Sequence, residues 1–178
     1  MIVNLINALP LIRGYISNRT EAQTRVKEPV SAITVGFRLD QACLIAIHFD
    51  TREKHERDGT WDVALDGPTL EMPHWNEAYE SANDAGVSFV LLTGEAYEIS
   101  SDVVDDEAVA GVFGEALLTI TLDALAAGVF DPLPLRDDCQ LDLEEFDGMW
   151  AWPNEAFDSE AVDRPNEIRR IRLAQLEH

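Results

Sequence analysis

Carboxylates and tryptophans crowd into one short stretch, DDCQLDLEEFDGMWAWP (137–153). An EF-hand calcium loop is excluded here, because counting back from Gly148 puts Leu143 at the first ligand position and Asn154 at the twelfth, which requires a glutamate. A catalytic pair of carboxylates would need a buried acid with a perturbed pKa, and spacing alone does not indicate one. Two interpretations remain: a solvated strand whose tryptophans close the core, or a surface that binds a basic partner.

An aromatic patch rimmed by acids is typical of a protein-binding surface, because aromatic side chains anchor the partner and charge steers its approach. The residues that could form such a surface here are Asp142, Glu144, Glu145, Asp147, Trp150 and Trp152. In an extended chain Trp150 and Trp152 would point to the same side. Large aromatic side chains are usually buried, so the favoured interpretation is that both tryptophans close the core.

A second set of chemically suitable side chains occurs in HFDTREKHE (48–56). His48 and Asp50 would share one face of a strand, and His55 follows in a polar loop. Imidazole and carboxylate groups are ligands for zinc and iron. The alternative hypothesis is therefore a metal-dependent or small-molecule-acting enzyme centred on His48, Asp50 and His55, although the spacing matches no established metal motif.

Signatures of common catalytic and nucleotide-binding sites are missing from the sequence. There is no Gly-x-Ser-x-Gly, no Cys-x-x-Cys and no glycine-rich phosphate loop. Lys27 and Lys54 are the only lysines, which makes Schiff-base chemistry unexpected. The sequence therefore favours a non-enzymatic protein, and we expect no cofactor.

The negative charge is concentrated in one part of the chain. Residues 58–163 contain 26 acidic side chains and one basic one, Arg136, whereas the whole chain of 178 residues carries a net charge of −21. Such a field repels nucleic-acid phosphates and anionic membrane surfaces, so we expect neither as a partner. It attracts a basic protein, although high net charge also serves solubility alone.

Hydrophobic periodicity predicts a single α+β domain over residues 1–175, with a mainly antiparallel sheet of about 4–6 strands packed by helices and with helices at both ends. The predicted helices are one or two short ones up to about Val26, then 75–85, 105–127 and one from about 163. The predicted strands are 32–39 and 42–49 in a tight hairpin, one from Trp61, a fourth after Gly67, and 139–146. The run 87–92 fits either a buried strand or the start of a helix.

Cellular setting is suggested by several weaker features. Cys43 and Cys139 fall in predicted strands, where a buried free thiol is usual, but a disulfide stays open. No stretch approaches the ~20 apolar residues of a membrane helix, and the apolar start lacks the basic region of a signal peptide. We therefore expect a cytoplasmic protein. Its last three residues, 176–178, are interpreted as the remnant of an expression tag.

A short, very acidic α+β chain without catalytic signatures resembles in a general way the immunity proteins that bacteria make against their own toxins. The resemblance is one of composition and carries over no site residues. Our leading hypothesis, which rests on the concentrated negative charge, is a non-enzymatic protein that masks a basic protein partner with the acidic span as its contact surface. A third hypothesis is a structural domain that oligomerises through the apolar N-terminal helix; the oligomeric state itself is not indicated by the sequence.

Overall fold

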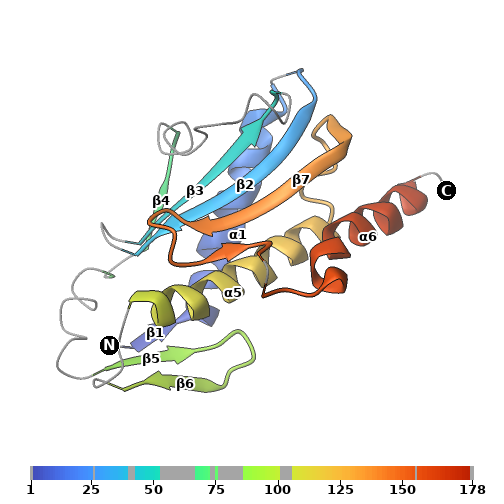
Figure 1. Ribbon diagram of the computed structural model, residues 1–178. Coiled ribbons are helices and arrows are strands. Elements are labelled where there is room, and N and C mark those ends of the chain that lie inside the picture. Colours follow the sequence, from blue (N-terminus) through green and yellow to red (C-terminus); the bar gives the residue numbers. More distant parts are fainter. Residues whose placement is uncertain are drawn as a thin grey trace.

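The computed structural model describes residues 2–25, 27–39, 43–52, 67–72, 75, 86–100, 106–154 and 156–176. The strand predicted from Trp61, most of the helix predicted over 75–85, the turn after residue 39 and His55 lie outside these residues. Within them the predicted α+β class is confirmed, with helices at both ends of the chain and two mixed sheets (Figure 1).

The larger sheet has five strands in the order β4-β3-β2-β7-β8. The strands are β4 (Leu70–Glu71), β3 (Leu44–Asp50), β2 (Val30–Arg38), β7 (Leu135–Glu145) and β8 (Ala151–Trp152). All residues of β2 except Arg38 are buried, which is why the sequence of this central strand is almost continuously apolar. The predicted antiparallel pairing of the first two strong strands is confirmed as β2 with β3, whereas β7 runs parallel to β2 on its other side.

The smaller sheet was not expected from the sequence. It contains β1 (Ile2–Asn4), β5 (Val87–Val90) and β6 (Ala96–Ile99), with β1 parallel to β5 and β6 antiparallel to it. The ambiguous run 87–92 thus begins as a strand. Antiparallel pairs predominate, as predicted, but each sheet also has one parallel pair. Parallel pairs join segments that are distant in the sequence, so local patterns do not reveal them.

Three helices pack with these sheets: α1 (Leu5–Gln23), α5 (Asp106–Ala126) and α6 (Ser159–Leu176). Where the sequence left one or two short helices open, α1 is a single helix that continues through Pro10. The Asn4 side chain caps it by accepting a hydrogen bond from the N–H of Asn7 at 2.9 Å. α5 matches the predicted helix over 105–127 and ends before Gly128, whose φ of +77° suits a left-handed C-terminal position.

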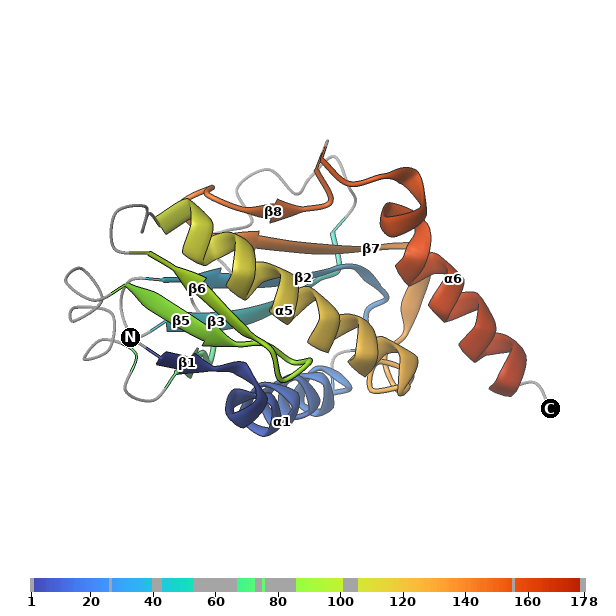
Figure 2. The same ribbon diagram turned by 90° about the horizontal axis from the view of Figure 1, so that it is seen from below.

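α5 lies between the two sheets, α1 runs along one side of the molecule, and α6 extends outward past the body (Figures 1 and 2). The core joins both sheets and α5; its fully buried side chains include Phe37, Phe89, Phe113 and Ile120. The expectation that no stretch approaches a membrane helix does not hold for α5, which is long enough and, with a mean hydropathy of 1.6 over 18 residues, apolar enough to cross a membrane. Of those 18 residues 56% are buried inside the molecule, as in the core helix of a folded domain. Cys43 and Cys139 are buried free thiols.

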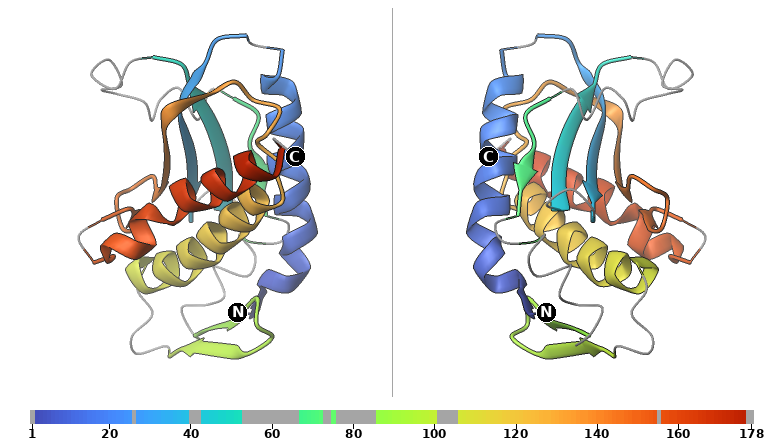
Figure 3. Two further views of the ribbon diagram at one scale, coloured as in Figure 1. Left: turned by 90° about the vertical axis from the view of Figure 1, so that its right-hand side faces the viewer. Right: turned by 90° about the vertical axis from the view of Figure 1, so that its left-hand side faces the viewer.

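α1 also covers the outer edge of β3, where the short β4 pairs only with Leu44 and Ile45 (Figure 3). The Tyr15 hydroxyl accepts a hydrogen bond from the N–H of Ile47 at 3.1 Å and donates one to the Pro68 carbonyl at 2.8 Å. Arg19 donates to the Ile47 carbonyl at 3.3 Å. Side chains of a helix therefore satisfy backbone groups of a strand edge that would otherwise be open to pairing with another chain.

Candidate functional site

The two tryptophans of the acidic stretch belong to the core rather than to an open surface. Trp152 is 2% exposed and pairs with Leu143 across β7 and β8. Trp150 is partly buried, with its ring centroid 6.0 Å from that of Phe37 and 6.5 Å from that of Phe157. The favoured interpretation, that these residues close the core, agrees with this packing. Trp152 is therefore not available as an anchor for a partner.

Glu145, another residue of the predicted partner surface, has a structural role in the turn after β7. It is 1% exposed, and its Oε2 accepts hydrogen bonds from the N–H groups of Asp147 at 2.7 Å and Met149 at 3.3 Å. Burial raises the pKa of Glu145, although these two hydrogen bonds oppose the rise. A buried carboxylate that organises its own turn is not a contact for a basic partner.

The other acids of the stretch retain some exposure. The predicted alternation of β7 is confirmed: Leu143 is buried, whereas Asp142 and Glu144 lie partly exposed on the opposite face. Burial, followed by the charges of Asp142 and Glu145, raises the pKa of Glu144 to about 7. Its Oε1 is buried and has no hydrogen-bond partner among the described residues. Asp147 lies on the turn with 52% of its side chain exposed and pairs loosely with Arg38 at 3.6 Å.

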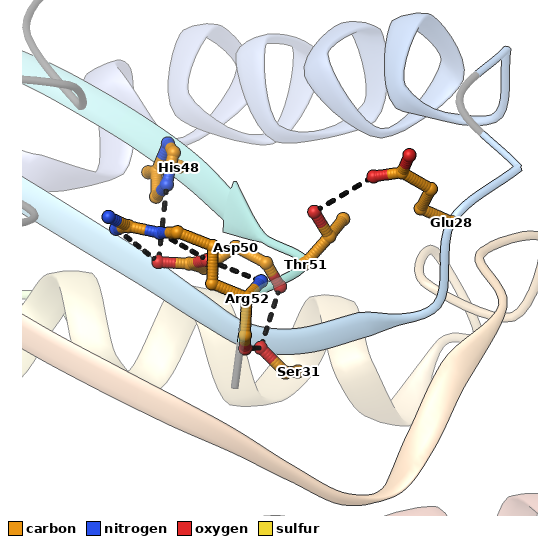
Figure 4. Close-up of polar contacts among 6 residues, drawn as sticks. All are labelled: Glu28, Ser31, His48, Asp50, Thr51 and Arg52. Atoms are coloured by element: carbon orange, nitrogen blue, oxygen red, sulfur yellow. Dashed lines mark hydrogen bonds and ion pairs between the residues drawn. The ribbon is translucent and has the colours of Figure 1, made fainter. Parts of the chain in front are cut away.

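His48 and Asp50 share a face of β3, as predicted, with His48 Nε2 3.7 Å from Asp50 Oδ2 (Figure 4). Arg52 already binds the carboxylate of Asp50. Its guanidinium lies 2.8 Å from Oδ2 and 3.1 Å from Oδ1, and its backbone N–H donates to Oδ1 at 2.8 Å. Burial raises the pKa of Asp50, but these interactions with Arg52 outweigh it, so the pKa lies below its usual value. Burial lowers the pKa of His48, and the charge of Asp50 partly opposes this effect.

Hydrogen bonds around Asp50 and Arg52 connect the end of β3 to the start of β2. Ser31 Oγ is within hydrogen-bond distance of the carbonyl oxygens of Asp50 (3.0 Å) and Arg52 (2.5 Å), and Thr51 donates to Glu28 at 3.2 Å (Figure 4). Within the described part of the chain, no three metal-ligating side chains come together. Because His55 lies outside that part, the metal hypothesis remains a prediction, which metal analysis of the purified protein would test.

The first half of β7 contains a feature that the sequence analysis missed. Leu135 pairs with Val30, but the next pair is Gln140 with Ala32, so the residues between them bulge away from β2. Arg169 of α6 donates to two carbonyls of this bulge, that of Arg136 at 2.8 Å and that of Cys139 at 3.2 Å. The first half of β7 could not be predicted from the sequence, because the bulge interrupts the alternation of apolar and polar residues by which the second half was recognised.

A groove of about 660 Å³ separates this part of β7 from α6. We call it the acidic groove, because its lining includes Asp137, Asp138, Asp142 and Asp163. Its bases are Arg169, which is occupied by the carbonyls of the bulge, and Arg170, which lies 3.9 Å from Glu167. Among the described residues that line it there is no histidine, serine or lysine. With four carboxylates in its lining, the groove is suited to hold a cationic group.

The N-terminal apolar surface keeps the third hypothesis open. Ile2 is 75% exposed, and on α1 the side chains of Ile6 and Leu11 are 40% and 45% exposed. Scattered exposed apolar side chains are normal on monomeric proteins, so this surface by itself does not indicate an oligomer.

Comparisons with known proteins identify no relative of this chain. No protein family matches it, and neither a curated protein nor a solved structure matches it significantly. Its function is therefore inferred from the geometry and charge of the chain itself.

Proposed function

We propose that this protein is a non-enzymatic binding protein that masks a basic protein partner through the acidic groove. The observation that carries the proposal is the groove itself: four aspartates line it, and one of its two lining arginines, Arg169, is already engaged by backbone carbonyls. Asp137 and Asp138 are exposed on the bulge, and the pairing of Asp138 with Arg136 at 3.3 Å is a surface ion pair of small energetic value.

The proposed surface differs from the one suggested by the sequence. Burial removes Glu145 and Trp152, and Trp150 is largely occupied by core contacts. Asp142 is common to both surfaces, because it lines the groove. Asp147 and Glu144 would contribute only to the surrounding field. The contact region thus moves toward the N-terminal half of β7.

The strength of the pairing would depend mainly on charge. Acidic side chains in a concave surface concentrate the field and speed the approach of a cationic partner. Salt screens such steering over about 8–10 Å at ionic strengths of 0.1–0.15 M. Because the tryptophans near the groove are turned into the core, few large aromatic anchors would offset that screening, and binding should weaken clearly in high salt.

A pull-down from the lysate of the source organism, run at low and high salt, tests the proposal. We expect one basic protein to be retained at low salt and lost at high salt. The site is tested by D137K/D138K, with E95K/E98K as a control of equal charge change on exposed acids in and next to β6. Only the first variant should abolish retention. An empty result with the unaltered protein, or equal loss for both variants, would contradict the proposal.

A further inference from the structure

We infer that the partner supplies an extended basic segment that adds to β7 as a new strand inside the acidic groove. This inference rests on the proposed function, because it names the form that a basic partner takes at that site. Strand addition to an open sheet edge is a general mode of peptide recognition, in which backbone hydrogen bonds provide affinity and side-chain sites provide specificity.

The outer edge of β7 is only half covered. β8 is the last strand of the sheet, and its two residues pair with Leu143 and Glu144; the N–H of Glu145 also donates to the Trp150 carbonyl at 2.8 Å. Backbone groups alternate between the two edges of a strand, so those of Leu141 point to the same edge as those of Leu143 and Glu145. In the described part of the chain, no strand pairs with this edge beyond Leu143. Arg169 already occupies the carbonyls of Arg136 and Cys139, so the backbone groups of Leu141 are the ones that an added strand would pair with.

α6 forms the opposite wall and leaves room for a segment. The Arg169 contacts with the bulge hold α6 beside β7, yet a volume of about 660 Å³ stays open between them. Residues 140–142 of β7 line this volume in regular register with β2, which corresponds to about 10 Å of strand, and the bulged residues 137–139 line it as well. The groove is therefore long enough for a short extended segment, and its volume is within the range of known ligand sites.

The groove walls also indicate the chemistry of the segment. Asp137 and Asp138 offer charge, whereas Leu141 and the 59% exposed Leu173 offer apolar contacts. Side chains of an added strand point alternately to two sides. A segment in which basic and apolar residues alternate would place its charges on one side and its apolar groups on the other. A shift of its register against β7 by one residue would exchange these two sides.

A peptide of eight residues that alternates Val and Arg, labelled with a fluorophore, is the probe for this inference. Its binding to the full chain is followed by fluorescence anisotropy at low salt. The matched probe has the same side chains but carries a methyl group on every backbone nitrogen, so it keeps its charge and cannot donate to β7. We expect the methylated peptide to bind more weakly by about tenfold or more, because each backbone donor would be lost.

A blocking variant tests the location. Asn166 lines the groove from α6, and N166W would fill it without changing the charge. N18W makes the same exchange at an exposed position of α1 and serves as the control. Circular dichroism establishes that both variants fold. We expect N166W to weaken binding of the unmethylated peptide by about tenfold or more, and N18W to leave it unchanged.

The outcomes separate this inference from the proposed function. Equal binding of both peptides would overturn strand addition while leaving charge-driven masking intact. Binding that N166W does not change would overturn the groove as the docking place. If neither peptide binds, the inference is also wrong, and the proposed function is then judged by the pull-down alone.

Discussion

The substitution E144Q should make the protein more stable at neutral and alkaline pH. Glu144 is a partly buried residue of β7, close to the charges of Asp142 and Glu145, and its Oε1 finds no hydrogen-bond partner among the described residues. Its pKa is raised from 4.5 to about 7. Glutamine has the shape of the protonated acid and never ionises, so it removes the cost of a charge at this position.

The direction follows from proton binding. Because the pKa of Glu144 is higher in the folded than in the unfolded protein, the folded state holds more protons between pH 4.5 and about 7. The free energy of unfolding therefore falls as pH rises through this window, and the loss is complete above it. The glutamine variant lacks this loss, so its advantage should be absent near pH 4 and should reach a plateau above pH 7.

The size of the effect is bounded by the pKa change. A rise from 4.5 to about 7 corresponds to about 3 kcal/mol at most. Since Glu144 is only partly buried, solvent screens some of this energy, and we expect about 1–2 kcal/mol at pH 8.

Urea unfolding followed by tryptophan fluorescence, at pH 4, 6 and 8, measures the difference between variant and unaltered protein. D138N is the matched control, because it removes a charge from the same strand at a side chain that is 78% exposed. An advantage of E144Q that does not change with pH, or a loss of stability at pH 8, would refute this reasoning.

Three further substitutions, the first with a matched control, test the packing of the fold. G114A should lower the free energy of unfolding in urea by about 1–3 kcal/mol, because a Cβ there would lie 2.5 Å from the Trp150 ring. G111A, its control in open space on the same helix, should raise that free energy by about 0.5–1 kcal/mol. Similar effects of the two substitutions would contradict the placement of Trp150. E145A should cost about 1–3 kcal/mol in thermal unfolding, because two backbone N–H groups lose their acceptor, and an unchanged midpoint would contradict the role of this turn. Y15F should speed hydrogen exchange of the β3 amide that its hydroxyl accepts from, by about tenfold, and unchanged exchange would show that α1 does not seal that edge.

Local patterns were sufficient for the elements that are strongly periodic. The apolar stripe of α5, the antiparallel pairing of β2 with β3 and the alternation in the second half of β7 were all predicted, because each depends on residues that are close in the sequence. β1, β6 and the bulged half of β7 were missed. β1 is three residues long and is completed by β5, more than eighty positions away, so nothing in its own sequence indicates a strand.

The sequence by itself determined the chemical resources of this protein: an excess of acids over bases, an apolar content sufficient for a core, and no signature of a common catalytic site. It also brought His48 and Asp50 to one face of a strand, because that relation depends only on their spacing.

Only the tertiary structure decided which of these groups face solvent. Glu145 and Asp137 are both acidic residues of one strand, yet the first is buried in its own turn and the second is exposed beside a groove. Burial depends on contacts between segments that are distant in the sequence, and composition and spacing do not encode those contacts locally.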